Sequence, residues 1–203
     1  MRYVDFEKGC GPSELVVKEC EGLSLAPGKV KVDVKAFGVN RADTLQRQGN
    51  YPPPPGESDI LGLEVAGVVS EVASDVTAFK EGDEVFGLVA GGGYATEVMV
   101  NPAHLMPIPK GMPYFEAAGL AEVFLTAFQC LRTIAHVKPA ERALIHGGAS
   151  GVGLAATQLC RYWGVHSAVT ASSQDKLSLC ESNGAEHLNT EKQQQYGDKL
   201  KKV

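Results

Sequence analysis

The sequence predicts an α/β plus β protein, in which an N-terminal β-barrel precedes an incomplete parallel α/β unit. Three observations support this prediction. Up to about residue 110, short β-branched segments alternate with turn residues. A long apolar stretch of helix formers then occupies residues 114–135, and strand, helix, strand and helix follow in that order. We expect the two domains to span residues 1–116 and 117–203.

Partial alternation of apolar and polar residues marks the strands of the first part. The segments are LVVKEC (15–20), KVKVDVKAFGV (29–39), EVAGVVSEVA (64–73) and DEVFGLV (83–89). The turn sequences APG, PPPPGES, KEGDE and AGGG separate or flank them. Many short strands at modest spacing predict a partly open barrel. The prolines at 52–55 predict a stiff extended loop.

The second part begins with YFEAAGLAEVFLTAFQCLRTIA, which predicts one or two largely buried helices. RALIH and VHSAVTA are short strands, each followed by a helical segment, GLAATQLCRYW and SQDKLSLCESN. Gly164 and Gly184 are placed to end these two helices. The final segment, EKQQQYGDKLKKV, predicts an exposed helix.

Composition narrows the function classes. A net charge of −5 argues against a broad nucleic-acid-binding surface. We expect no membrane partner and a cytosolic protein, because no apolar run approaches the length needed to span a bilayer and the N-terminus lacks the apolar core of a signal peptide. The five cysteines form no CxxC pair, which predicts reduced and mostly buried thiols.

A glycine-rich turn lies between a predicted strand and a predicted helix, in ALIHGGASGVGLAA. A dinucleotide loop needs glycine where the chain turns and where the pyrophosphate approaches the free amides of the next helix. Gly148, Gly151 and Gly153 meet this need, with Val152 between the last two. Ser150 replaces the middle glycine of GxGxxG, so a purely structural glycine turn stays an alternative.

The cofactor choice depends on a second segment, TASSQDK, about 20 residues further along. An acid at this point would bind the ribose hydroxyls and repel a 2′-phosphate. Ser172, Ser173 and Lys176 offer hydroxyls and a cation instead, which favours NADPH over NADH, although Asp175 weakens the positive field. The alternative is that the serines cap a helix and Lys176 is a solvated side chain.

Several ordered motifs resemble one family. They are GVNRADTLQRQGNYPPPPGESDILGLEVAGVV, GDEVFGLVAGGGYATEVMV, LTAFQCL and ALIHGGASGVG. Together they resemble the zinc-independent, zeta-crystallin-like quinone oxidoreductases of the medium-chain dehydrogenase/reductase superfamily, in particular the tumour-suppressor-inducible type. The resemblance implies an N-terminal GroES-like β-barrel and an incomplete Rossmann domain, with NADPH and substrate between them.

The implied reaction is hydride transfer from NADPH to a quinone or enone without zinc. Zinc-dependent relatives carry Cys and His where this chain has Asn40 and Leu63. By resemblance, Asn40 and Tyr51 are the catalytic residues, and Asn40 also contacts the cofactor. Tyr51 would donate to the developing oxyanion. The alternatives are that Asn40 caps a turn and that Tyr51 packs on the proline loop.

The resemblance also implies roles for other residues. Thr126 would contact the nicotinamide end, or else bond its own helix backbone. Ser150 would touch the nicotinamide side or the pyrophosphate. We expect Asp43 and Arg47 to form a structural ion pair, and Glu64 to be a buried structural carboxylate with a nearby donor.

Family members continue well beyond the length of this chain. We therefore expect a C-terminally truncated protein whose first Rossmann strand and cofactor crevice lack neighbours, and whose dimer edge is missing, although full-length members would be homo-oligomers. Thr190 stands where the family often has a tyrosine against the adenine. The expected function is an impaired NADPH-dependent quinone oxidoreductase. The alternatives are an enone or enoyl reductase, or a non-catalytic isoform that acts by binding.

Overall fold

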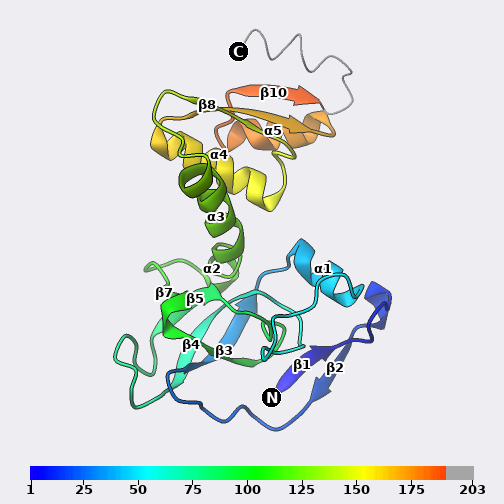
Figure 1. Cartoon of the computed structure of the whole chain (residues 1–203), viewed down its shortest axis with the longest axis vertical. Coiled ribbons are helices and arrows are strands. Elements are labelled where there is room, and N and C mark those ends of the chain that lie inside the picture. The colour runs from blue at the N-terminus through cyan, green and yellow to red at the C-terminus, as the bar shows by residue number, and fades with distance from the viewer. Residues whose placement is uncertain (191–203) are drawn as a thin grey trace. The chain divides into compact units, whose positions relative to one another are not determined.

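The chain forms two compact units, Met1–Glu122 and Val123–Val203 (Figure 1). The computed structural model describes residues 1–190, and for residues 187–190 it describes only the backbone. The first unit is rich in strands, and the second combines strands with longer helices. A β-rich unit followed by an α/β unit confirms the predicted fold class. The division into functional domains after residue 116 stays a prediction.

The first unit is built on a five-stranded antiparallel sheet with the order β6-β3-β4-β5-β7. Its strands are β3 (Val30–Phe37), β4 (Glu64–Val72), β5 (Glu84–Leu88), β6 (Glu97–Val100) and β7 (Leu105–Pro107). A separate antiparallel pair joins β1 (Arg2–Asp5) to β2 (Val16–Glu19). The four expected strands are β2, β3, β4 and β5. The other three strands were not predicted, since three or four residues carry little alternation.

Alternation along β4 sends its side chains into two different cores. Val65 and Val69, each 1% exposed, pack inside a cluster made almost entirely of valines from β3 to β6. Ala66 faces the other way and packs against Ala117, Ala118 and other residues of the helical segment that follows β7. Because successive side chains of a strand point to opposite faces, β4 contributes to the valine cluster on one face and packs against α2 on the other.

The helices of the first unit are short. They are the helix α1 (Arg41–Arg47), the helix α2 (Tyr114–Ala117), and the 3₁₀ turns Pro12–Glu14 and Pro102–His104. The helix α3 (Ala121–Phe128) begins at the end of this unit, and a π-helical segment, Gln129–Ile134, continues it. The apolar stretch therefore forms two helices, as the sequence allowed, with a break at residues 118–120.

Two expectations about this apolar stretch are wrong, namely that no apolar run approaches the length of a membrane span and that its helices are largely buried. By length and composition alone, the 21 residues of Tyr114–Ile134 could cross a membrane, and only 22% of the apolar 18-residue window within them is buried. The buried stripe consists of alanines, which allow the helices to approach the sheet closely. The large residues lie off that stripe, so Phe115 is 74% exposed and Ile134 is 67% exposed.

The second unit contains a parallel sheet with the order β10-β9-β8. Its elements are β8 (Arg142–Ile145), α4 (Gly151–Trp163), β9 (His166–Ala171), α5 (Gln174–Ser182) and β10 (His187–Thr190). Both helices pack on the sheet face that carries Ile145 and Val169. Gly164 ends α4 in the left-handed conformation, with φ of 68°, as predicted.

One outer strand of this sheet was expected at its edge and the other was not expected at all. β10 was not predicted, while β8 lies at an edge of the described sheet, as the expected strand order requires. Thr190 is the last residue of β10. The helix expected over residues 191–203 lies outside the described residues.

All five cysteines are free thiols. Only Cys160 and Cys180 are buried, in the second unit, and burial raises the pKa of both thiols. Cys20 and Cys130 are exposed and Cys10 is partly exposed, so the expectation of mostly buried thiols is wrong. Cys10 and Cys20 lie in coil, where apolar periodicity gives no signal of burial, and Cys130 lies within the π-helical segment.

Candidate active site

The predicted site residues fall into two groups, one in each unit. Asn40 and Tyr51 belong to the first unit, and the predicted cofactor residues from Thr126 to Lys176 belong to the second. Each group is described within its own unit.

Asn40 begins α1 as its N-cap residue, with extended backbone angles of −117° and 157°. Its backbone N–H donates to Asp43 Oδ2 at 2.7 Å, which secures the first turn. Its side chain is directed elsewhere, because Nδ2 donates to Glu64 Oε1 at 2.8 Å. Asn40 therefore occupies the expected capping position while a buried carboxylate holds its amide group. With Nδ2 donating to this carboxylate, Oδ1 is left as the acceptor of the amide.

Glu64 is the first residue of β4 and is 2% exposed. Its Oε1 accepts from Asn40, and its Oε2 accepts from the backbone N–H of Glu122 at 2.9 Å. Gly38 leaves the space for it, since a Cβ at residue 38 would come within 2.6 Å of Glu64 Cγ. The expectation of a buried carboxylate with nearby donors is thus met. Glu64 links the start of α1 to the start of α3.

Asp43 does not pair with Arg47, so the expected ion pair is wrong. Its side chain is buried on α1, at 3% exposure, and Oδ2 accepts from the hydroxyl of Tyr94 at 2.9 Å. Arg47 lies one turn further along α1. The donors to Asp43 are instead the backbone N–H of Asn40 and the hydroxyl of Tyr94. Burial raises the pKa of Asp43 above its usual value. Burial and the nearby Asp43 charge also raise the pKa of Tyr94.

Tyr51 lies beside a cavity of about 180 Å³ in the first unit. Its side chain is 46% exposed, and prolines of the following loop line the same cavity. The lining residues are Gln46, Tyr51, Pro53, Pro54, Leu63, Leu88, Val89, Ala90 and Glu122. The position next to the prolines accommodates both interpretations of Tyr51, packing and substrate contact.

Glu122 is the member of this cavity that the sequence analysis missed. Burial raises the pKa of Glu122, and the charges of Glu64 and Asp43 contribute further in the same direction. The available signal was a carboxylate in the apolar run LAEVF, just as Glu64 was singled out within GLEVAGV. A charged residue in an apolar segment is expected to have a specific environment.

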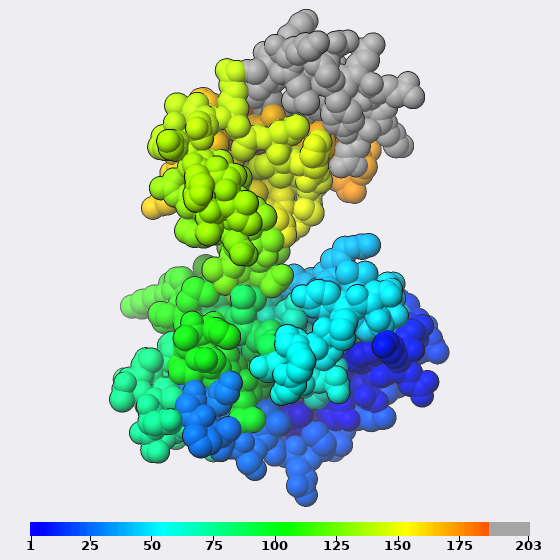
Figure 2. Space-filling model, in the orientation of Figure 1, coloured from blue at the N-terminus to red at the C-terminus, as the bar shows by residue number. Residues whose placement is uncertain are grey.

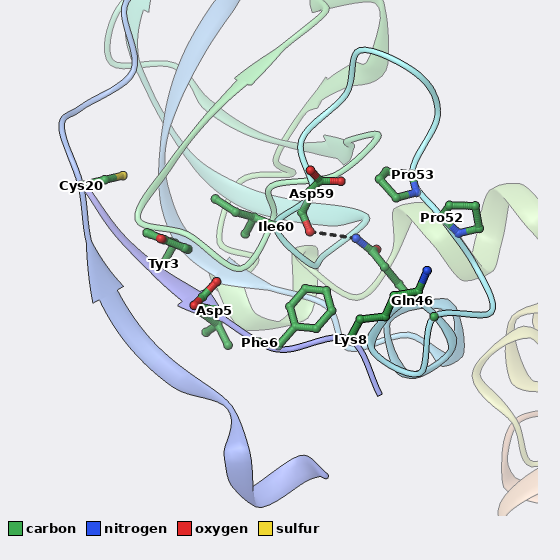
Figure 3. A pocket seen from close by; sticks show the side chains of 12 residues that line it. Tyr3, Asp5, Phe6, Lys8, Cys20, Gln46, Pro52, Pro53, Asp59 and Ile60 are labelled. Atoms are coloured by element: carbon green, nitrogen blue, oxygen red, sulfur yellow. Dashed lines mark hydrogen bonds between the residues drawn. The ribbon is translucent and has the colours of Figure 1, made fainter. Parts of the chain in front are cut away.

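A larger cavity of about 560 Å³ lies between the N-terminal strand, the end of α1 and the proline loop (Figure 3). In the space-filling view, the loop around residues 50–60 lies at the surface of the first unit, near the N-terminal residues (Figure 2). Gln46 and Pro53 line both cavities, and Gln46 Nε2 donates to the Asp59 carbonyl at 3.0 Å. Of the two predicted catalytic residues, Tyr51 lines only the smaller cavity, and Asn40 is in neither lining.

The glycine turn of the second unit connects β8 to α4. Ser150 is the N-cap residue, and its Oγ accepts from the Gly153 N–H at 3.1 Å. A Cβ at Gly153 would lie 2.5 Å from the Gly147 carbonyl oxygen, so glycine is needed where the helix meets the turn. Gly148 donates its N–H to the Thr170 carbonyl of β9 at 2.8 Å. These contacts hold the turn at the carboxyl end of the sheet.

Gly151 and Val152 form the first turn of α4, where backbone amides have no partner within the helix. A Cβ at Gly151 would lie 2.9 Å from Val123 Cγ1, so the glycine allows α3 to pack close to this turn. Val152 is 36% exposed. Thr126, on α3, is partly buried, and its hydroxyl has no hydrogen-bond partner among the described residues. The alternative of a bond to its own helix backbone is therefore not observed.

Ser172, Ser173 and Lys176 come together at the carboxyl end of β9. Ser173 is the N-cap residue of α5, and its Oγ accepts from the backbone N–H of Lys176 at 3.4 Å. Lys176 Nζ donates to Ser172 Oγ at 2.9 Å. All three are exposed. Because β8 and β9 are adjacent parallel strands, this cluster and the glycine turn lie at the same edge of the sheet.

The described residues contain no group of three or more His, Cys, Asp or Glu side chains that could hold a metal ion. At the positions where zinc-dependent relatives would carry Cys and His, Asn40 donates to a carboxylate and Leu63 lines the small cavity. An amide and an aliphatic side chain do not supply the ligands that zinc prefers.

Comparison with known proteins identifies the first unit. Residues 26–110 match the alcohol dehydrogenase GroES-like domain. A quinone oxidoreductase from Homo sapiens is 34% identical over 175 residues, which cover 86% of this chain and 53% of that protein. The pikromycin polyketide synthase component PikAII from Streptomyces venezuelae is 43% identical over 148 residues, or 73% of this chain and 4% of that protein.

Solved structures share the fold of both units. The Escherichia coli quinone oxidoreductase complexed with NADPH has a TM-score of 0.90 and 31% identity, and covers 100% of this chain and 62% of its own. The CurK enoyl reductase has a TM-score of 0.90 and 28% identity, over 99% of this chain and 63% of its own. This chain spans about half the length of the curated quinone oxidoreductases that it matches. Over both units, the chain is similar to quinone oxidoreductase-like members of the medium-chain dehydrogenase/reductase superfamily.

Proposed function

We propose that this chain carries the cofactor-binding turn and the substrate-facing cavity of an NADPH-dependent quinone oxidoreductase. The observation that carries the proposal is the cluster of Ser172, Ser173 and Lys176 at the carboxyl end of β9, beside the glycine turn. Hydroxyls and a cation at this point suit the 2′-phosphate that distinguishes NADPH from NADH. The likeness to a quinone oxidoreductase complexed with NADPH supports the same cofactor.

The residues of the second unit fit this cofactor. The first-turn amides of α4, at Gly151 and Val152, point out of the helix as phosphate donors. Ser150 Oγ accepts from Gly153, so its hydroxyl proton stays available for a phosphate oxygen. Lys176 and Ser172 already lie within 2.9 Å of one another and are exposed, so a phosphate could bind both. Thr126 offers a hydroxyl with no described partner, on the helix whose Val123 packs against Gly151 of this turn.

Bound NADPH would supply the hydride, and residues of the first unit would bind and orient the acceptor. Tyr51 would donate its hydroxyl proton in a hydrogen bond to the developing oxyanion. Asn40, with Nδ2 fixed by Glu64, presents its carbonyl oxygen in one orientation. The apolar lining of the small cavity, with Leu63, Leu88 and Val89, would exclude water from the reacting atoms.

A second candidate is an enone or enoyl reductase. The CurK enoyl reductase, which equals the quinone oxidoreductase in TM-score, favours this alternative. Both reactions deliver a hydride to a carbon conjugated with a carbonyl group, so the same residues would serve either one. A cytosolic location is part of the proposal, because it follows from composition, whereas homo-oligomeric assembly is proposed only for full-length members of the family.

The test is NADPH oxidation by the full chain with two acceptors, tetramethyl-1,4-benzoquinone and an enoyl thioester. This quinone has no free ring position for addition of the exposed thiols. Quinone turnover supports the proposal, and turnover confined to the thioester favours the second candidate. Absence of saturable NADPH binding by nicotinamide fluorescence would refute both.

The cofactor assignment has its own variant. Lys176→Gln should weaken NADPH binding by about 5–30-fold, since an exposed charge-assisted contact contributes about 1–2 kcal/mol. NADH binding should stay unchanged. Lys138→Gln is the matched control, because it removes the same charge from an exposed residue before β8, at the opposite end of the sheet. Equal effects of the two variants on NADPH binding would contradict the assignment.

A further inference from the structure

Glu122 has no role in the reaction described so far, although it lines the same cavity as Tyr51. Its backbone N–H donates to the buried Glu64 carboxylate at 2.9 Å, which fixes the residue at the start of α3. Its own carboxyl group is partly buried and has no hydrogen bond or ion pair among the described residues. The backbone of Glu122 is thus fixed beside the cavity, and its unpartnered carboxyl group is available to a ligand there.

The groups around Glu122 favour its protonated form. The negative charges of Glu64, on β4, and of Asp43, on α1, both act on its carboxyl group. Tyr51 is the other titratable group of the described lining, and no Lys, Arg or His lines the cavity there. Burial and the two negative charges raise the pKa of Glu122, so it retains its proton to higher pH than an exposed glutamate. An acid tuned in this direction is suited to proton donation.

The cavity is large enough for the reacting part of a substrate. Its volume is about 180 Å³, and an apolar cavity of roughly 150 Å³ is enough to hold benzene. Its polar members are Gln46, Tyr51 and Glu122, and Gln46 is already bonded to the Asp59 carbonyl. A single quinone ring, or the conjugated end of an enone, would therefore meet two proton donors among apolar walls.

We propose that Glu122 is the catalytic proton donor of the reduction, an inference that rests on the proposed function. The acceptor gains a hydride from the bound cofactor, which is oxidised, and an electron pair is left on the acceptor oxygen. The O–H bond of Glu122 then breaks as an O–H bond forms on that oxygen, which gives the keto tautomer of the hydroquinone. The ring carbon that received the hydride then loses its proton to water as the second oxygen gains a proton, which completes the hydroquinone. The resulting Glu122 carboxylate regains a proton from water. Tyr51 orients the same oxygen by a hydrogen bond.

The first test needs no turnover. Glutamate labelled with ¹³C at Cδ is incorporated in the full chain, and each carboxyl group is titrated by NMR. This label leaves Asp43 silent. One glutamate should titrate above the usual range in the wild type and be missing from Glu122→Gln. Glu116→Gln is the matched control, since Glu116 is exposed on α2 and outside the described cavity lining. Persistence of the raised titration in Glu122→Gln would overturn the inference.

The second test measures reduction of tetramethyl-1,4-benzoquinone by NADPH. Glu122→Gln should lower the rate about 10²–10⁴-fold, the usual contribution of a general acid, with NADPH binding changed less than about 2-fold. The wild-type rate should fall as pH rises through the raised pKa, and the residual Glu122→Gln rate should not. A rate for Glu122→Gln within about 3-fold of wild type would overturn the proton-donor role.

The two tests separate this inference from the proposed function. Loss of the raised titration in Glu122→Gln, together with wild-type protein that neither binds NADPH nor reduces the quinone, would refute the proposed function and the donor role with it. Normal wild-type turnover that Glu122→Gln and Glu116→Gln leave equally unchanged would refute only the donor role.

Discussion

Gly38→Ala should disrupt the Glu64 network that joins Asn40 to α3. A Cβ at residue 38 would come within 2.6 Å of Glu64 Cγ, about 0.8 Å short of an ordinary contact. The two hydrogen bonds of Glu64, at 2.8 and 2.9 Å, would lengthen to about 3.6 and 3.7 Å if the side chain moved away by that amount, beyond hydrogen-bond range. Overpacking costs about 1–3 kcal/mol and a bond to a charged group contributes about 1.5–3 kcal/mol. Since relaxation can save one of the bonds, we expect a loss of about 2–4 kcal/mol in the free energy of unfolding.

Native-state hydrogen exchange measures this loss in each unit separately. Amides of β3 and β4 should lose protection in Gly38→Ala, while amides of β8 and β9 should not. Gly119→Ala is the control, because a Cβ there has only one neighbour within 4 Å, the Glu116 carbonyl at 3.9 Å, and its φ is not positive. Protection of β4 that differs by less than about 0.5 kcal/mol between the two variants would refute the account of the Glu64 site.

Two further predictions concern single contacts. Tyr94→Phe removes the hydroxyl that donates to Asp43 at 2.9 Å and should cost about 1–3 kcal/mol at pH 7. Because burial raises the folded-state pKa of Asp43, stability should fall as pH rises from its usual pKa through the raised one, and more steeply in Tyr94→Phe; urea unfolding with a cost independent of pH would contradict this. Ser150→Ala removes the N-cap of α4 and should lower stability by about 1 kcal/mol, whereas Ser150→Thr should retain most of it. Equal unfolding midpoints for both Ser150 variants would contradict the capping role.

Local patterns predicted the elements that a single segment can specify. The alternation in KVKVDVKAFGV and EVAGVVSEVA gave β3 and β4, and Gly164 ended α4 because a left-handed residue is needed there. The cluster of Ser172, Ser173 and Lys176 was also predictable, since all three lie within one turn of a helix start. The structure shows Ser173 as the N-cap residue of α5, and its cofactor contact stays a proposal that this capping role does not oppose.

The errors concern contacts between segments far apart in the sequence. Asp43 and Arg47 are four residues apart on one helix, a spacing that suggested an ion pair, but the fold brings Tyr94 to Asp43 instead. Glu122 was missed for the same reason, because its environment is set by Glu64 and Asp43. The burial of residues 114–134 was overestimated, since apolar content alone does not reveal that alanines form the packed stripe.

The most direct measurement of the central claim is a fluorescence titration of the full chain with NADPH and with NADH. The account predicts saturable nicotinamide fluorescence with NADPH, at a Kd at least about tenfold lower than with NADH, a difference of about 1.4 kcal/mol. The 2′-phosphate beside Lys176 and Ser172 would be its source. Equal affinity for the two cofactors, or no saturable change with either, would contradict the account.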